Sequence, residues 1–262
     1  MRIPCPNRIA TLMLAFLLAA YLALVPAGAQ QSDLQAIYKR YQEYYQAGNY
    51  AAAVVEAQKL EAVVKGRFGT NHTNYATALN NLARVYWRQG KYSEAEGLYK
   101  RALAIREKAL GANHPDVAQT LNNLALVYAD QRKHGEAEEL YKRALAIREK
   151  ALGANHRDVG QTLHNLAYLY WRQGKYSEAE GLYKRALAIR ETALGANHPD
   201  VGQTLNNLAL VSRPEQARRG GGTLQARVGD PRASARCEPP RRGPDSPQSG
   251  ISLLEARQVQ RG

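Results

Sequence analysis

Apolar residues between positions 73 and 114 follow helical spacing in two consecutive runs. In the first run they recur at i, i+3, i+4 and i+7, on one face of a helix: Leu79, Leu82, Ala83 and Tyr86. The pair Gly90-Lys91 interrupts this pattern. A second stripe then contains Ala95, Leu98, Tyr99, Ala102, Ile105 and Ala109. The segment therefore predicts two antiparallel helices, and Gly111 ends the second.

The start of the following helix has its own sequence signals. Asn113 and His114 supply a polar cap, Pro115 occupies the first helical position, and Asp116 lies near the positive end of the helix. Within the second helix, Glu96 and Lys100 are four residues apart on the predicted wet side, where they are expected to pair.

This pattern repeats every 42 residues. The same spacing separates His72, His114, His156 and His198, and also Asn81, Asn123, Asn165 and Asn207. The complete units are 73–114, 115–156 and 157–198, with a half unit at 199–211. Because a helix pair with narrow apolar stripes cannot bury them alone, the units must stack. We therefore predict an all-α fold, an α-solenoid of stacked antiparallel helix pairs.

Several positions have specific packing roles in this prediction. Small Ala83 and Ala95 allow the two helices of a pair to approach closely, and Tyr86 and Tyr99 fill the space between pairs. Residues 30–72 match the unit loosely from residue 32 onward, and we predict a divergent helix pair that caps the array.

Together, these small, aromatic and glycine positions resemble the tetratricopeptide repeat in the 42-residue variety of kinesin light chain. The resemblance covers about residues 32–211 and includes Asn81-Leu82-Ala83, Gly90-Lys91-Tyr92 and Glu94-Ala95-Glu96. It implies a right-handed superhelix whose first helices line a concave groove for a peptide or partner protein. It implies no catalysis.

The predicted groove residues lie on the first helices, opposite Leu82, Ala83 and Tyr86. They are Asn80, Asn81, Arg84, Arg88, Asn122, Asn123, His164, Asn165, Tyr168, Arg172 and Asn207. Asparagine offers a donor and an acceptor, so a ladder of them suits the backbone of an extended peptide; in the resembled family, groove asparagines have this role. The arginines add a preference for acidic ligands. The alternative is that these amides bond only within the array or sit in water.

Other candidate chemistry gives weaker signals. Each recurrent histidine stands beside a helix start, which favours capping over metal binding, since zinc needs several ligands converging on one point. His134 and His164 are single departures from the repeat, and we predict that they are surface residues. No nucleophile with a spaced base, phosphate loop or metal-ligand cluster appears, so the sequence predicts no enzyme, cofactor or metal.

The net charge of the chain would suggest a nucleic-acid partner, but the positions of the charged residues along the sequence do not support one. The chain has 36 Lys+Arg and 23 Asp+Glu, which gives +13. Residues 212–262 contain ten Arg and five acidic residues, and Arg2 and Arg8 lie near the amino terminus. We therefore predict a protein or peptide partner and no nucleic acid. The two cysteines, Cys5 and Cys237, supply no disulfide framework for the repeats.

The first 29 residues have the pattern of an export signal. Arg2 and Arg8 precede an apolar run over 9–25, and Ala27-Gly28-Ala29 offers a small-residue cleavage site. We predict an exported, periplasmic or secreted protein with no stable membrane insertion after cleavage. The alternative is a membrane anchor formed by an uncleaved amino-terminal segment.

Residues 212–262 depart from the repeat and form an Arg, Gly and Pro-rich tail predicted to be disordered. Read one base later, codons for Gly220–Gln225 can encode Ala-Glu-Gly-Leu-Tyr-Lys, the sequence at 95–100. We infer a reading-frame shift near the Val211 codon. Two functions follow: an exported, non-enzymatic scaffold for protein interactions, or a frame-shifted structural remnant without its own ligand. Resequencing around the Val211 codon distinguishes them.

Overall fold

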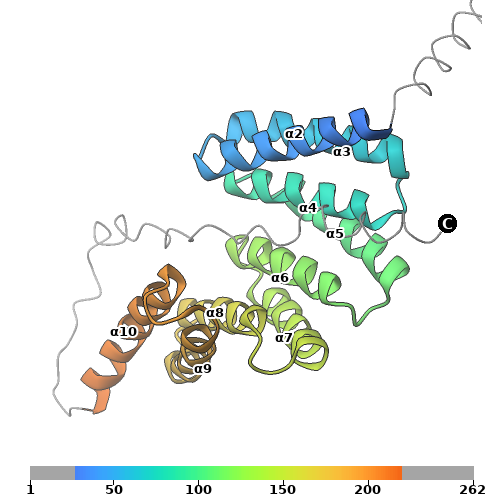
Figure 1. Cartoon of the computed structure of the whole chain (residues 1–262). Helices are drawn as coiled ribbons and strands as arrows, with labels where there is room; N and C mark the ends of the chain where they lie inside the picture. Colours follow the sequence, from blue (N-terminus) through green and yellow to red (C-terminus); the bar gives the residue numbers. More distant parts are fainter. Residues whose placement is uncertain (1–26, 220–262) are drawn as a thin grey trace, which may run out of the picture. The chain divides into compact units, whose positions relative to one another are not determined.

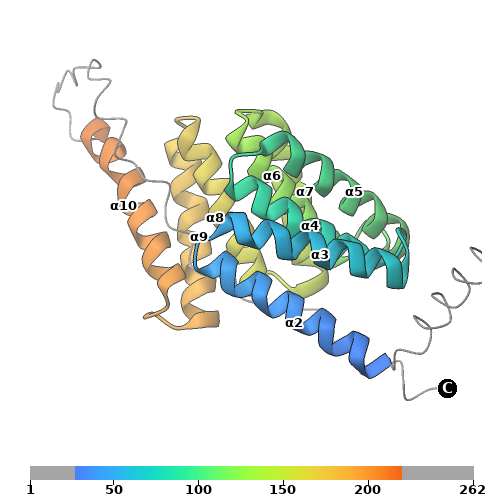
Figure 2. The same cartoon turned by 90° about the horizontal axis from the view of Figure 1, so that it is seen from above.

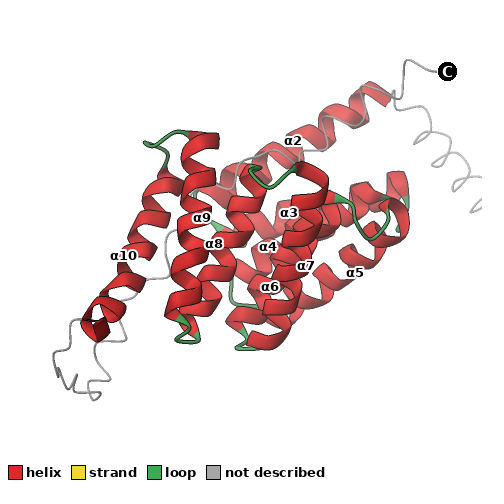
Figure 3. Ribbon diagram, turned by 90° about the horizontal axis from the view of Figure 1, so that it is seen from below, coloured by secondary structure: helices red, strands yellow, loops and turns green. Residues whose placement is uncertain are grey.

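The computed structural model describes residues 27–219, all of whose regular elements are helices (Figure 3). The predicted signal lies mostly before this range, and most of the Arg-rich tail lies after it. The chain divides after Val63 into two compact units, which are taken in turn.

The first unit contains α2 (Ala27–Gln46) and most of α3 (Tyr50–Phe68). Gly48, at φ 73°, occupies the turn between the two helices. Arg40 Nε lies 3.0 Å from Glu56 Oε2, and the rings of Tyr45 and Tyr50 meet edge to face. The divergent helix pair is therefore present, while its role as a cap stays a prediction.

The second unit contains three complete helix pairs and one further helix (Figures 1 and 2). Each pair packs closely, and each second helix also contacts the first helix of the following unit. The elements are α4 (Thr73–Arg88), α5 (Tyr92–Leu110), α6 (Pro115–Asp130), α7 (His134–Leu152), α8 (Arg157–Arg172), α9 (Tyr176–Leu194) and α10 (Pro199–Arg219). This arrangement confirms the predicted α-solenoid.

The recurrent histidines cap the first helices, as predicted. In each unit the imidazole Nδ1 accepts a hydrogen bond from the backbone N–H two residues further on. For His114 the donor is Asp116 N at 3.1 Å, and Pro115 stands in the first turn of α6. This bond satisfies one of the donors that a helix start leaves open, which explains the 42-residue histidine spacing.

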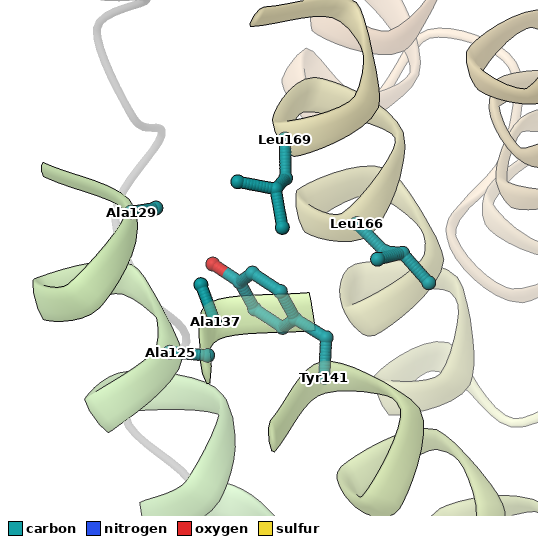
Figure 4. Close-up of a cluster of buried hydrophobic side chains, with 6 residues drawn as sticks. All are labelled: Ala125, Ala129, Ala137, Tyr141, Leu166 and Leu169. Carbon is teal, nitrogen blue, oxygen red and sulfur yellow. The ribbon is translucent and has the colours of Figure 1, made fainter. Parts of the chain in front are cut away.

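A buried tyrosine fills the space between successive pairs. In Figure 4 the Tyr141 ring of α7 points between Ala125 of α6 and Leu169 of α8, and all three belong to one buried cluster. Tyr99 has the equivalent place, at 2% exposure, against Ala83 and Ala95. The predicted roles of Tyr99 and of the small alanines are therefore confirmed. Tyr86 packs at the edge of the same cluster and remains half-buried.

Buried arginines form a second connection between units, which the sequence interpretation missed. Arg106, Arg148 and Arg190 are at most 5% exposed. Arg148 Nη1 donates to Asp158 O at 2.8 Å and to Thr162 Oγ1 at 2.7 Å, and the other two arginines repeat these bonds to the next first helix. Burial lowers the pKa of all three guanidinium groups. The sequence does contain a signal for this connection, since an arginine recurs every 42 residues within the apolar stripe of the second helix.

Glu96 forms a third connection, on the more exposed side. It accepts hydrogen bonds from Lys100 at 2.7 Å, from Gln131 at 3.0 Å and from Lys133 at 3.1 Å, so it joins α5 to the α6–α7 connection. Burial raises the pKa of this carboxyl, but the three donors outweigh it and lower the pKa to about 2. The predicted Glu96–Lys100 pair is confirmed. Glu138 forms a similar connection in the following unit, where it accepts from Lys142, from the Tyr170 hydroxyl and from Lys175.

The last helix extends beyond the predicted end of the repeat. α10 continues past Val211 to Arg219, so the expectation of no stable helix after Val211 is wrong for its first residues. The side-chain pattern nevertheless changes where predicted: Ser212 stands at the position of Tyr170, one of the donors to Glu138. The helix therefore continues beyond the last residue that matches the repeat, because the backbone hydrogen bonds of a helix do not require the side chains of the repeat.

Candidate functional site

One face of each first helix remains half-buried. In α4, α6 and α8 this face has one residue at each of three positions, spaced i, i+3 and i+7, which is one side of a helix. We call these nine residues the first-helix stripe: Asn81, Arg84 and Arg88 on α4, Asn123, Leu126 and Asp130 on α6, and Asn165, Tyr168 and Arg172 on α8. Because each first helix contacts the first helix of the next unit, the three sets lie beside one another along the array.

Four predicted groove residues lie outside this stripe: Asn80, Asn122 and His164 on the complete units, and Asn207 on α10. Asn80, Asn122 and His164 are 7%, 2% and 5% exposed, so their placement in an open groove, and the surface position of His164, are wrong. Each lies one residue before a stripe position, about 100° around the helix, where the neighbouring first helix covers it. Asn80 Nδ2 donates to Ala76 O at 2.9 Å and lies 3.5 Å from Thr120 Oγ1 of α6.

The asparagine row also bonds within the array. Asn165 Nδ2 donates to Asn122 Oδ1 at 3.2 Å. Asn207 Nδ2 lies 3.3 Å from His164 Nε2, and Asn207 is only 8% exposed. These contacts favour the alternative interpretation for part of the row, in which the amides hold neighbouring units together. Asn207 is thus an internal residue in this structure.

Acidic and basic stripe residues compensate each other between units. Arg172 Nη1 lies 3.2 Å from Asp130 Oδ1, and both side chains are about one-quarter exposed. Trp87 Nε1 on α4 donates to the other carboxylate oxygen of Asp130 at 2.8 Å. Asp130 therefore joins three successive first helices, and it offsets part of the positive charge that Arg172 would offer to an acidic ligand.

An aromatic surface lies beside this ion pair on α8. The rings of Tyr168 and Trp171 stack with their centroids 5.6 Å apart, and the Arg172 guanidinium lies 6.0 Å from the Tyr168 centroid. Tyr168 is half-buried and packs against the buried cluster of Ala167, Ala179, Tyr183 and Val211. Such a restrained amphipathic side chain is suited to protein contacts.

The central stripe position differs in every complete unit. It is Arg84 on α4, Leu126 on α6 and Tyr168 on α8, and Leu210 occupies it on α10 with 48% exposure. By contrast, the alanine directly before it is present in all four helices and is buried in the complete units. The units therefore differ in sequence at the central position of the half-exposed stripe, whereas the buried alanine next to it is the same in every unit.

Residues 27–219 contain no group of three His, Cys, Asp or Glu side chains placed to hold a metal ion. None of the helices in that range has the length and apolar character to cross a membrane.

Comparison with known protein families identifies the fold. Family models described as "Tetratricopeptide repeat" match residues 76–116, 116–192 and 158–219, together more than half of the chain. The chain belongs to the tetratricopeptide repeat family and is kinesin light chain-like. No curated protein matches it.

Solved structures agree with this assignment. A putative kinesin light chain of Podosopora anserina with nearly identical TPR-like repeats, in a singly substituted form, is 27% identical, with a TM-score of 0.60 over 72% of this chain and 89% of that one. A second structure of that protein gives 27% identity and a TM-score of 0.59, over 72% and 90%. BtubC (BKLC) from P. vanneervenii shares the fold at 21% identity and a TM-score of 0.53, over 77% and 96%. The chain is thus a protein-interaction scaffold.

Proposed function

We propose that this protein is an exported, non-enzymatic scaffold that binds an extended segment of a partner protein along the first-helix stripe. The observation that carries the proposal is the varied row Arg84, Leu126 and Tyr168 in the three complete units. Near-identical units give the row a regular spacing, and its different side chains give each unit its own contact. A surface of this kind can distinguish one linear sequence from another.

The contacts along the stripe divide into anchoring and orienting groups. Tyr168, held by Trp171 and Arg172, offers a rigid aromatic face that loses little conformational entropy on binding. Leu126 offers an apolar contact one unit away. Asn123 and the remaining bonding capacity of Asn165 suit the backbone of an extended segment. The amides therefore orient the ligand, and the varied row selects it.

Arg84 and Arg88 give the α4 end of the stripe a basic character, which supports a partner with acidic residues at one end. Asp130 offsets Arg172 at the other end, so we propose the acidic preference for the α4 end alone. The export signal predicted from the sequence of residues 1–29 supports a partner outside the cytoplasm. That part of the proposal rests on sequence.

The experiment begins with selection of peptides from a random 12-residue library on the full chain. The selected peptide is then titrated calorimetrically against Tyr168→Ala, Leu126→Ala and Arg84→Ala. Each variant should bind at least fivefold more weakly and keep its melting temperature within a few degrees. Ala104→Ser, a change at an exposed position of α5, is the matched control. Equal binding by the three variants and the control would contradict the proposal.

A further inference from the structure

The last helix exposes a face that every complete unit covers. Leu205 of α10 is 46% exposed, whereas its equivalent on α8, Leu163, is 0% exposed. Ala209 is likewise exposed, while Ala167 is 0% exposed. Gly202 and Asn206 are exposed too, and their equivalents on α8 are buried. We call Gly202, Leu205, Asn206 and Ala209 the α10 end face.

In a complete unit, the second helix covers most of this face. His164, the counterpart of Asn206, is covered both by α9 and by the next first helix, where it lies 3.3 Å from Thr204 Oγ1. Leu163 of α8 packs with Ala186 and Ile189 of α9, and Ala167 packs with Ala179 and Tyr183. The fit is close at Gly160, where an added Cβ would lie 3.1 Å from Ile189 Cγ2. At Gly202 an added Cβ would meet nothing within 4 Å.

The end face has the same chemistry as the covered face of α8. Residues 200–209 and 158–167 differ at a single position, Asn206 in place of His164. Val201 and Thr204 of α10 are buried against the preceding unit like their counterparts, and Arg190 of α9 bonds to Thr204 Oγ1 at 2.7 Å. One side of α10 is therefore built into the array, while the other is complementary to a second helix.

In the repeat register, the sequence that follows α10 does not have the pattern of a second helix. α10 runs through 215–217, the positions where the preceding unit turns at 173–175. Further along, Gln225 stands at the position of Tyr183, and Pro231 at that of Ile189. A side chain that fills the core and a helix-forming residue are replaced by a polar residue and a helix breaker. In the repeat register, the sequence after α10 therefore lacks the side chains with which α9 covers α8.

We propose that the α10 end face is a docking site for a helix of the second-helix type carried by another protein. The docked helix has the apolar pattern Ala179, Tyr183, Ala186 and Ile189, at i, i+4, i+7 and i+10, and lies on α10 as α9 lies on α8. The repeat thus continues in trans, on a face separate from the first-helix stripe.

The test uses a fluorescently labelled 19-residue peptide with the sequence Tyr176–Leu194, titrated into the full chain and followed by anisotropy. We expect saturable binding, on the order of micromolar, because the isolated peptide loses conformational entropy on docking. A peptide carrying Tyr183→Ala should bind at least tenfold more weakly, since this ring fills the space between pairs. A peptide carrying Lys184→Ala, a change at an exposed position, should bind within twofold of the parent.

The matched chain variants are Ala209→Leu and Ala188→Leu, both at exposed helical positions. Ala209→Leu should weaken peptide binding at least tenfold without lowering the melting temperature, because the leucine occupies the space of the docked helix. Ala188→Leu should bind as the parent does. Arg84→Ala, on α4, should also leave peptide binding unchanged, which separates this site from the stripe.

Two results would overturn the proposal. One is the absence of saturable binding, or equal effects of Ala209→Leu and Ala188→Leu. The other is a sedimentation experiment in which the chain alone forms a dimer that Ala209→Leu dissociates while the peptide fails to bind. The occupant would then be the α10 end face of a second copy.

Discussion

Asn165 of α8 donates from Nδ2 to Oδ1 of Asn122 on α6 at 3.2 Å, across the boundary between two units. A row of amides that suits a peptide backbone therefore also holds its own units together. An asparagine has four hydrogen-bonding sites, and this bond uses one on each residue. The amide row is thus both a structural element and a candidate ligand contact, and its two roles are separable by mutation.

Replacing Asn122 by Ala should lower the free energy of unfolding by about 1 kcal/mol, since Asn165 loses its partner near the buried boundary. Asn123→Ala, at a half-buried stripe position, should cost less. Chemical denaturation of both variants measures the difference. A double-mutant cycle of Asn122→Ala with Asn165→Ala should show coupling; strictly additive losses would mean that the bond contributes nothing to stability.

The buried arginines should contribute more to the free energy of unfolding than the partly exposed ones. Arg148→Ala should lower the free energy of unfolding by about 2–4 kcal/mol, because it removes charge-assisted bonds to Asp158 O and Thr162 Oγ1 and leaves a cavity. Arg143→Ala removes a partly exposed ion pair with Glu107 and should cost under about 1 kcal/mol. Urea denaturation compares the two. Equal losses would show that the guanidinium bonds do not connect the units.

Tyr141 and Tyr86 should contribute differently to stability, although both are tyrosines of the repeat. Tyr141 is 1% exposed between two units, so Tyr141→Ala should cost about 3–5 kcal/mol through a core cavity. Tyr86 lies at the edge of its cluster, and Tyr86→Ala should cost clearly less. Thermal and chemical unfolding of both variants tests this order, and the reverse order would place the core elsewhere.

Acid should weaken the contact that Glu96 makes between α5 and the α6–α7 connection. The pKa of this carboxyl is lowered to about 2 in the folded chain, below its usual value of 4.5. Its contribution to stability is therefore complete above the unfolded pKa and is lost as pH falls from about 4.5 toward 2. Glu96→Gln should show a shallower loss of stability over this range. If the stability of the parent and of the variant changed identically with pH, the ionised Glu96 carboxylate would make no contribution to stability.

The helix pairs, their histidine caps and the Tyr99-type core contacts were predictable because each depends on local spacing. Apolar residues at i, i+3, i+4 and i+7 define a helix face, and a 42-residue period repeats that face whatever its neighbours do. The stripe residues Asn81, Asn123 and Asn165 were also placed on the half-exposed side by this reasoning. The bond of Asn165 to Asn122, by contrast, exists only because the units stack.

Burial between units was not predictable in the same way. Asn80 and His164 are polar, and a helical wheel puts them next to the stripe, but the adjacent first helix covers them. Arg148 has a charged head in an apolar stripe, and only the backbone carbonyl and threonine of the following unit explain its burial. The burial of these side chains depends on the rotation between one unit and the next, and that rotation cannot be derived from the sequence of a single unit.

The most direct test of the proposed function is photo-crosslinking of the library-selected peptide to the full chain, followed by mass spectrometry of the adducts. The account predicts adducts on α4, α6 and α8 at or beside Arg84, Leu126 and Tyr168, and their loss when unlabelled peptide competes. Competable adducts confined to the outer side of α5, α7 and α9, at positions such as Ala104 and Ala146, would contradict it.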